Sequence, residues 1–507
     1  MQLKHNIFAN YLSTIYVTVV GIVILPLYIR YMGAEAYGLV GFFTMLQAMF
    51  ALLDLGLTPT ISRETARNKA GVTTSQEYRG LVRALSIIFA IIALVGGGLL
   101  FSLSSTISGD WLNIEKLPLA EVVFSLQVMS ISVALRWMGG LYRGVVTGNE
   151  KIVWLSGFNA FLATLRFIIV LPVMFYFGAN ITVFFLYQLI IAALELMVLV
   201  TKARSLLPLL SSEQKLKLGW TLAPVRPLIR FSLSIALTSS IWVFVTQTDK
   251  IIISKLLTLT EYGYFTLAVL VAGGIHLLAS PVGVALRPRL ANLFAEGKDE
   301  ELLSLYNAST QFVAIIVSSA VATVVLFAPH ILFVWTGSKE ISDIVADTLV
   351  LYTIGYGMQA LGAFPFYLQF AVGKLRLHVI GSVLFALILI PSILYLVSAY
   401  GMIGAGWAWL LCNSVFFVFW VPIIHHSLYK GLHIRWIFKE IMPIVVSLFI
   451  MALIFRNFFA IDLTSSVEMT LLNIVGFGIA SLIVAVVMAR DVRKFLVEKL
   501  VRKKQHD

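Results

Sequence analysis

Hydrophobic runs of about 20 residues alternate with short polar segments along nearly the whole chain. Because the hydrocarbon core of a bilayer takes ~20 apolar residues per helix, each run predicts one membrane-spanning helix. The pattern predicts fourteen spans, at residues 6–30, 36–60, 81–105, 119–142, 151–176, 181–203, 228–255, 261–284, 302–328, 345–370, 376–398, 402–424, 440–457 and 469–489. We therefore expect an all-α polytopic membrane protein.

The pattern also repeats within the chain. The polar elbow after the first span, Glu35–Gly38 (EAYG), is echoed by Thr260–Gly263 (TEYG), at an offset of 225 residues. The same offset relates four further pairs of residues: Arg30 with Lys255, Tyr142 with Tyr367, Gly148 with Gly373, and Lys151 with Arg376. Matches at one fixed offset predict a duplicated unit of six spans.

Each repeat starts on the same side of the membrane, since six spans separate the two starts. This predicts two six-helix lobes that are parallel repeats about a pseudo-two-fold axis along the membrane normal, a plan used by transporters. Two extra helices follow at the C-terminus. The predicted divisions are an N-lobe at 1–203, a cytoplasmic linker at 204–227, a C-lobe at 228–424, spans 13 and 14 within 425–490, and a basic cytoplasmic tail at 491–507.

Composition supports the membrane assignment. Of the 507 residues, 60% are hydrophobic and 12% are charged, and the mean hydropathy is +0.95, which no soluble domain of this length could bury. The net charge of +12 is compatible with nucleic-acid binding, but the basic residues sit in short loops and form no continuous face. We therefore expect membrane lipids, and no nucleic acid, around the chain. The single cysteine, Cys412, excludes an intrachain disulfide.

The basic residues also set the orientation. Most of the 37 lysines and arginines fall in the N-terminus, the even-numbered loops and the tail, whereas few fall in the odd-numbered loops. Because positive residues stay on the cytoplasmic side, both termini are predicted to be cytoplasmic. The opposite loops are short, which leaves no room for an external catalytic domain.

Ionisable residues inside the spans are the strongest candidates for a site. A charge at the bilayer centre costs ~2.5–3.5 kcal/mol, so such a residue faces a cavity or a partner. In one interpretation, Arg136, Arg166 and Lys250 line a wet cavity and attract an anionic group. In the other, the charges pair internally, for example Arg166 with Glu195.

Acidic residues suggest ion coupling. Asp54, Glu195 and Asp249 are candidates to bind a coupling H⁺ or Na⁺, the one cofactor-like requirement that the sequence suggests. Arg30 and Lys255 end matching spans and are weaker substrate-binding candidates, since they also suit a role as interfacial anchors. No phosphate-binding loop, nucleophile elbow or zinc motif occurs, which counts against a pump or a hydrolase.

Several of these segments together resemble a known family. They are Pro26, Arg30–Gly33, Glu35–Gly38, Asp54–Leu57 with Arg63, and Tyr142–Lys151 (YRGVVTGNEK). The chain resembles the polysaccharide-export flippases, including O-antigen repeat-unit flippases, of the superfamily that also holds the lipid II flippase and the multidrug-and-toxin extruders.

The resemblance implies a V-shaped central cavity, lined largely by spans 1, 2, 7 and 8. It implies transfer of an undecaprenyl-diphosphate-linked oligosaccharide, such as an O-antigen or capsule repeat unit, across the bacterial cytoplasmic membrane. Glycan polymerases and glycosyltransferases are the implied partners. In the lipid II flippase the last two helices form a groove for the lipid tail and the first span carries essential arginines. Here the first span has no charge before Arg30, so lipid II itself is in doubt as the substrate.

Residues and resemblance together predict a non-enzymatic flippase that works by alternating access, with Arg166, Arg136 and Lys250 holding the diphosphate. The main alternative is a cation- or proton-coupled multidrug antiporter, which favours a net acidic cavity. A glycan polymerase or ligase is a second alternative, disfavoured by the short outer loops. A scaffold that transports nothing is a third, and pairing of every buried charge would favour it.

Overall fold

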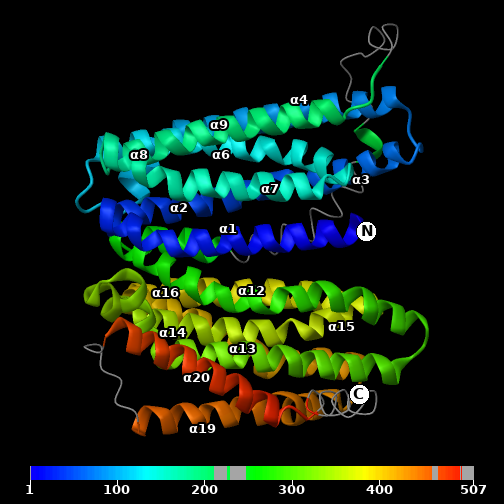
Figure 1. Cartoon of the computed structure of the whole chain (residues 1–507), viewed down its shortest axis with the longest axis vertical. Coiled ribbons are helices and arrows are strands. Elements are labelled where there is room, and N and C mark those ends of the chain that lie inside the picture. The colour runs from blue at the N-terminus through cyan, green and yellow to red at the C-terminus, as the bar shows by residue number, and fades with distance from the viewer. Residues whose placement is uncertain (1, 211–224, 229–246, 459–465, 491–492, 494–507) are drawn as a thin grey trace, which may run out of the picture. The chain divides into compact units, whose positions relative to one another are not determined.

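The computed structural model describes residues 2–210, 225–228, 247–458, 466–490 and 493, and within these ranges the chain is helical without named strands (Figure 1). Most of the predicted seventh span lies outside the described residues. The same holds for most of the predicted linker at 204–227 and of the tail at 491–507. The prediction of an all-α polytopic membrane protein is confirmed.

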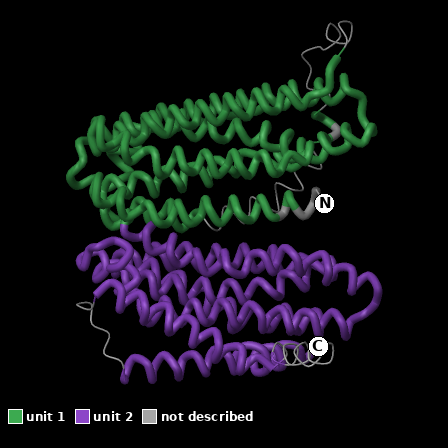
Figure 2. Tube along the Cα trace, viewed as in Figure 1, with its two compact units in different colours: residues 1–263 green, residues 264–507 purple. Residues whose placement is uncertain are grey.

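The chain divides into two compact units, residues 1–263 and 264–507 (Figure 2). This division does not test the predicted boundaries at 203 and 228, which stay predictions. The helices of unit 1 are α1 (Gln2–Met32), α2 (Ala34–Phe50), α3 (Leu57–Lys69), α4 (Ser75–Ser102), α5 (Ser104–Thr106), α6 (Leu119–Gly148), α7 (Ile152–Ala163), α8 (Val170–Phe177) and α9 (Ile181–Leu206).

Helix α12 (Leu259–Ala295) begins in unit 1 and continues into unit 2. The remaining helices of unit 2 are α13 (Asp299–Thr336), α14 (Lys339–Gly362), α15 (Phe364–Val372), α16 (Arg376–Val415), α17 (Val421–Leu428), α18 (Leu432–Arg435), α19 (Met442–Phe458) and α20 (Val467–Met488).

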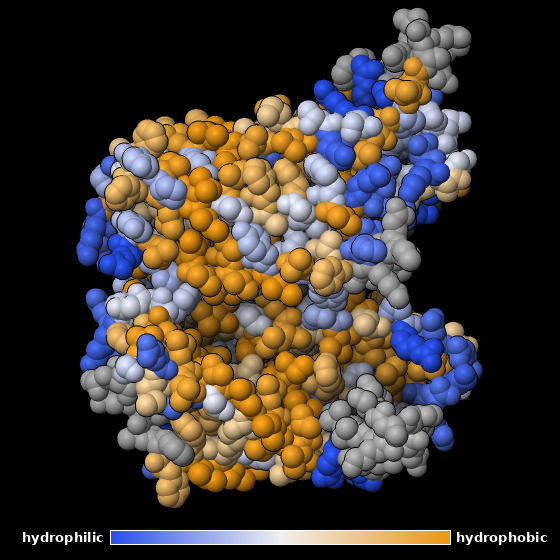
Figure 3. Space-filling view, viewed as in Figure 1, coloured by the Kyte–Doolittle hydropathy of each residue, from blue (hydrophilic) through white to orange (hydrophobic). Residues whose placement is uncertain are grey.

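Twelve helical stretches within the described residues are long and apolar enough to cross a membrane. The longest, Arg376–Leu428, is interrupted at Gly401, whose φ of 59° and ψ of −140° are not helical. It therefore supplies two runs, which match the predicted spans at 376–398 and 402–424. Apolar side chains cover the middle of the helices, and hydrophilic ones gather at their ends (Figure 3).

Each unit has its own core. Ile61, Phe89 and Val145 are completely buried in unit 1, and Tyr306 and Trp436 are completely buried in unit 2. Burial of such large apolar groups orders each bundle through close packing.

Polar contacts attach the segment between predicted spans 12 and 13 to the core of unit 2. The His425 Nε2 lies 2.7 Å from the Tyr306 hydroxyl, and the Nδ1 atoms of His425 and His433 are 3.1 Å apart. The Trp436 indole donates a 3.0 Å hydrogen bond to the Thr310 hydroxyl. These histidines therefore bind protein groups, and His425 is fully buried.

The elbow at the start of α2 is anchored by a buried carboxylate. Gly33 ends α1 with a φ of 89°, a conformation that favours glycine. Two residues later, Glu35 is 6% exposed, and its carboxylate accepts backbone N–H bonds of 2.6–3.1 Å from Glu115, Lys116 and Leu117. Glu35 thereby ties the segment before α6 to the elbow.

The two repeated elbows contact each other within unit 1. A Cβ added at Gly38 would lie 2.1 Å from the carbonyl oxygen of Leu259, and one added at Gly263 would lie 2.5 Å from that of Ala34. Only glycine allows such an approach of two helix backbones. The motif that reveals the duplication in the sequence is therefore also a reciprocal packing contact.

Replacing Glu35 by alanine should strongly destabilise the protein, because three backbone N–H groups lose the buried, charged acceptor that they share. We expect a loss of about 3 kcal/mol, seen as a lower melting temperature in detergent. Glu121→Ala, at the exposed start of α6, is the control and should melt like the wild type. Equal melting of the two variants would show that the Glu35 contacts contribute no stability.

Candidate functional site

Two parallel rows of polar side chains face each other across α6 and α9. On α6, Arg136 and Arg143 are seven residues apart, and on α9 so are Gln188 and Glu195, a spacing that keeps both members of a row on one helix face. Arg136 donates from Nη2 to Gln188 Oε1 at 2.6 Å, and Arg143 donates from Nη2 to Glu195 Oε1 at 2.5 Å. Both bonds join positions 52 residues apart, so the helices are in register over two turns.

Arg166 joins these two rows from a third helical segment. We call the set of Arg136, Arg143, Arg166, Gln188 and Glu195 the ladder. Arg166 lies in a π-helical segment, η3 (Thr164–Ile169), between α7 and α8, and its guanidinium donates to Glu195 Oε2. Glu195 therefore holds one guanidinium with each of its oxygens.

The π-helical turn is stabilised by side chains from two other helices. A π-turn disturbs the regular pairing of backbone carbonyls and is frequent at functional sites. In η3 the carbonyl of Leu165 accepts a bond from the Tyr187 hydroxyl, that of Arg166 from Gln188 Nε2, and that of Phe167 from the Tyr28 hydroxyl, at 2.9–3.0 Å. Polar groups of α1 and α9 thus hold the segment that presents Arg166.

Arg136 is bound by neutral partners. Its Nη1 donates to Gln47 Oε1 at 2.9 Å and its Nη2 to Gln188, while its guanidinium carbon lies 5.1 Å from the centre of the Phe43 ring. The Nε atoms of Arg136 and Arg166 are buried and have no hydrogen-bond partner within the part of the chain that the structure describes. Both residues retain donor capacity for a further acceptor.

The ladder carries excess positive charge, because it contains three guanidiniums and one carboxylate, which pairs with two of them. The Glu195 side chain is 4% exposed, whereas those of Arg166 and Arg143 are 22% and 28% exposed. An anion approaching the ladder therefore meets guanidiniums first. In a low-dielectric surrounding, such a cationic cluster attracts an anion far more strongly than in water.

Three of the predicted site residues, Arg136, Arg166 and Glu195, are brought together in this way. The Arg166–Glu195 contact is the internal pairing that the sequence left open. Asp54 bonds to its own neighbouring turn: its carboxylate accepts a 2.5 Å bond from the Thr58 hydroxyl and a 3.2 Å bond from the Thr58 backbone N–H, in the first turn of α3. This contact gives Asp54 a helix-capping role.

The other predicted residues are elsewhere. Lys250 Nζ lies 3.4 Å from Asp249 Oδ1, and the Asp249 side chain is 2% exposed. Arg30 is exposed in the last turn of α1, and Lys255 is exposed with its Nζ 4.8 Å from the centre of the Trp111 ring. These positions suit interfacial anchors, and the substrate-binding role stays a prediction.

Arg143 is a candidate that the sequence does not single out, because it lies one residue beyond the predicted span at 119–142. The structure places it inside α6, where its Nη1 donates to Asn159 Oδ1 at 2.6 Å. The signal was the seven-residue spacing from Arg136, which puts both arginines on one face of a longer helix. The same spacing would have linked Gln188 to Glu195.

The close approach of α3 brings Thr58 next to the arginine face of α6. A Cβ at Gly144 would lie 2.9 Å from the Thr58 carbonyl oxygen, and one at Gly148 would lie 2.3 Å from that of Ser62. These two glycines let the backbones of α3 and α6 touch, which fixes the rotation of α6.

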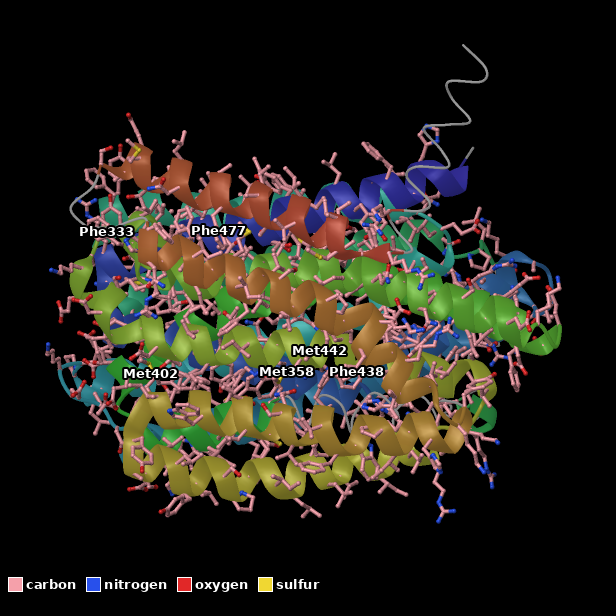
Figure 4. The ribbon with its side chains drawn as sticks, turned by 90° about the horizontal axis from the view of Figure 1, so that it is seen from below. Phe333, Met358, Met402, Phe438, Met442 and Phe477 are labelled. Atoms are coloured by element: carbon pink, nitrogen blue, oxygen red, sulfur yellow. The ribbon has the colours of Figure 1, made fainter. Side chains whose placement is uncertain are left out.

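Unit 2 contains a feature of different chemistry, a largely apolar cavity of about 900 Å³ between α13, α14 and α19. Met358 of α14 and Met442 of α19 both line it, and both are labelled in Figure 4. In α19 and the turn before it, its lining runs from Ile437 to Arg456, which is roughly 28 Å at 1.5 Å per residue and close to the thickness of a bilayer core.

Metal ligation has no support in the described ranges, which contain no group of three or more His, Cys, Asp or Glu side chains able to hold an ion. Within the described residues, the ladder and the apolar cavity are therefore the two candidate ligand sites.

Comparison with known proteins assigns the family. A family model described as "Polysaccharide biosynthesis protein" matches residues 3–294, more than half of the chain. The chain belongs to this family. It is also 21% identical over 401 residues to a putative O-antigen transporter from Shigella flexneri, a match that covers 77% of this chain and 90% of that protein.

Solved structures share the fold of this family member. The lipid II flippase MurJ, in an inward closed conformation, aligns with a TM-score of 0.75 at 14% identity, covering 95% of this chain and 99% of that one. An inward-facing multidrug resistance transporter of the MATE family aligns with a TM-score of 0.63 at 16% identity, covering 83% and 96%. At these identities the likeness establishes the fold alone.

The predictions of a transporter rather than an enzyme, and of the polysaccharide-export resemblance, are confirmed by these matches. As a member of the polysaccharide biosynthesis protein family, the chain is a multi-pass membrane protein, and its cationic ladder lies within the matched residues 3–294.

Gln188→Leu should destabilise the ladder, because the substitution keeps the side-chain volume but removes an acceptor from Arg136 and a donor from the Arg166 carbonyl. We expect a loss of about 2 kcal/mol in a detergent melt, the usual scale for leaving buried polar groups unpaired. Gln127→Leu, at a half-buried position of α6, is the matched control. A Gln188→Leu protein as stable as the control would mean that the ladder does not hold the helices.

Proposed function

We propose that this family member is a flippase that moves an undecaprenyl-diphosphate-linked oligosaccharide across the bacterial cytoplasmic membrane. The observation that carries the proposal is the excess of guanidinium over carboxylate in the ladder of α6, η3 and α9. Both termini lie in the cytoplasm, as the distribution of basic residues predicts, and transport proceeds by alternating access.

Charge is the main barrier that such a carrier removes. A diphosphate cannot cross hydrocarbon unaided, since burying an unpaired anion is prohibitively costly. Arg166 and Arg136, each with a free Nε in the described part of the chain, replace the lost hydration. The planar guanidinium suits phosphate oxygens because it donates two parallel hydrogen bonds.

The remaining parts of the substrate have different requirements. The polyprenyl chain stays in the surrounding lipid, since it is as apolar as the bilayer core. The sugars occupy water beside the ladder. Further basic residues proposed to attract the headgroup are Lys250, Arg30 and Lys255.

The coupling ion and the enzymes that make and use the substrate involve groups outside the ladder. Asp54 and Asp249 are the proposed groups for coupling to H⁺ or Na⁺, since both carboxylates are partly or fully shielded from water. Glycosyltransferases must supply a lipid-linked glycan, and a polymerase or ligase must consume it, so these enzymes are the proposed partners.

A multidrug antiporter for organic cations is the main alternative, in line with the fold shared with MATE transporters. The ladder disfavours it. A cationic drug would meet three guanidiniums and one carboxylate that is already doubly paired. Raised resistance to cationic dyes on overexpression would favour the alternative over the flippase.

The test is transport in reconstituted liposomes that carry a fluorescent undecaprenyl-diphosphate-linked oligosaccharide. Arg166→Ala and Arg136→Ala should each slow transfer between leaflets by tenfold or more, the scale of one lost charge-assisted hydrogen bond. The same assay on Lys250→Ala tests the weaker assignment. Arg204→Ala, exposed at the end of α9, should transfer lipid at the wild-type rate.

Two results would overturn the proposal. One is wild-type protein that transfers no lipid-linked oligosaccharide. The other is unchanged transfer by both arginine variants of the ladder. That result would leave the family assignment intact but show that the diphosphate does not bind at the ladder.

A further inference from the structure

Glu195 occupies the place where an anionic ligand of the ladder would bind. Its two oxygens are each bonded to a different guanidinium, Arg143 on one side and Arg166 on the other. A phosphate group would use its oxygens in the same way. We propose that Glu195 competes with the phosphate of the substrate for the guanidinium of Arg166, and that the Arg166–Glu195 pair forms again when the substrate leaves. This inference rests on the proposed function.

The two arginines are held differently, which decides which one is exchanged. Arg143 has a second anchor, the 2.6 Å bond to Asn159 Oδ1. Arg166 has Glu195 as its carboxylate partner, and its buried Nε has no hydrogen-bond partner among the described residues. Arg166 is therefore the guanidinium that passes to the phosphate, and Arg143 is the positioning residue that stays on Glu195.

This division avoids an unpaired buried charge at every stage. When Arg166 turns to the phosphate, Glu195 keeps its bond to Arg143, so the carboxylate, which is 4% exposed, remains neutralised. A buried charge stripped of both partners would be strongly destabilising. The exchange therefore replaces one ion pair with another.

A competitor serves transport because a carrier must release what it binds. Three arginines without a carboxylate would hold a diphosphate tightly, and slow release would limit turnover. Glu195 lowers the affinity by the free energy of the Arg166–Glu195 pair, which re-forms as the phosphate departs. Affinity and turnover are thus predicted to move in opposite directions when Glu195 loses its charge.

The experiment measures binding of undecaprenyl diphosphate to purified protein in detergent by isothermal titration calorimetry, with uncharged undecaprenol as the control ligand. Glu195→Gln should bind the diphosphate on the order of tenfold more tightly than the wild type and transfer lipid-linked oligosaccharide more slowly. Glu195→Asp keeps the charge and should bind more nearly like the wild type. Loss of a merely structural contact would weaken binding instead.

A second variant tests the inference independently of how well Glu195→Gln folds. In Arg143→Gln, Glu195 pairs with Arg166 alone and holds it more tightly. Diphosphate binding should therefore weaken by several-fold. Adding Glu195→Gln to Arg143→Gln should restore it, because Arg143 acts through Glu195.

The outcomes separate the two proposals. Wild-type protein that binds undecaprenyl diphosphate no better than undecaprenol would overturn the proposed function. Wild-type binding with equal or weaker affinity in Glu195→Gln, or equal or tighter affinity in Arg143→Gln, would overturn the competitor role alone.

Discussion

The shared carboxylate of Glu195 is the interaction on which the account of unit 1 depends. A guanidinium within a membrane span must be compensated, and here one carboxylate compensates two guanidiniums while amides compensate a third. The requirement draws α6, η3 and α9 together at one level. It also leaves more positive than negative charge, so the same contacts that hold the helices make the site attractive to an anion.

Backbone features follow from this constraint. The π-helical turn at Thr164–Ile169 presents Arg166, and its displaced carbonyls accept bonds from Tyr28, Tyr187 and Gln188. Gly144 and Gly148 let α3 approach α6, and the Glu35 carboxylate fixes the segment that leads into α6. Each of these contacts positions the backbone of α6 or of η3.

Much of the fold was predictable, because its signals are long and redundant. Apolar runs identified the spans, and the repeated elbow motif identified residues that prove to be in contact, Gly38 and Gly263. Within the site, the sequence singled out Arg136, Arg166 and Glu195 and named the Arg166–Glu195 pair as one of two alternatives. A charge in an apolar run is a strong signal because few other reasons keep it there.

The remaining parts of the site were not predictable by the same reasoning. Arg143 sits near the end of an apolar run, where the length of a span cannot distinguish a loop residue from one that reaches back into the bundle. The π-turn at Arg166 depends on Tyr28 and Gln188, which are remote in sequence. The doubly bonded state of Glu195 depends on three helices at once, which a pattern along one helix does not reveal.

The most direct test of the central claim is a cryo-electron microscopy structure of the protein with undecaprenyl diphosphate bound. The account predicts phosphate density within hydrogen-bond distance of the Arg166 guanidinium, with Glu195 still bonded to Arg143. Diphosphate density at another site, with both arginines unchanged on Glu195, would contradict it.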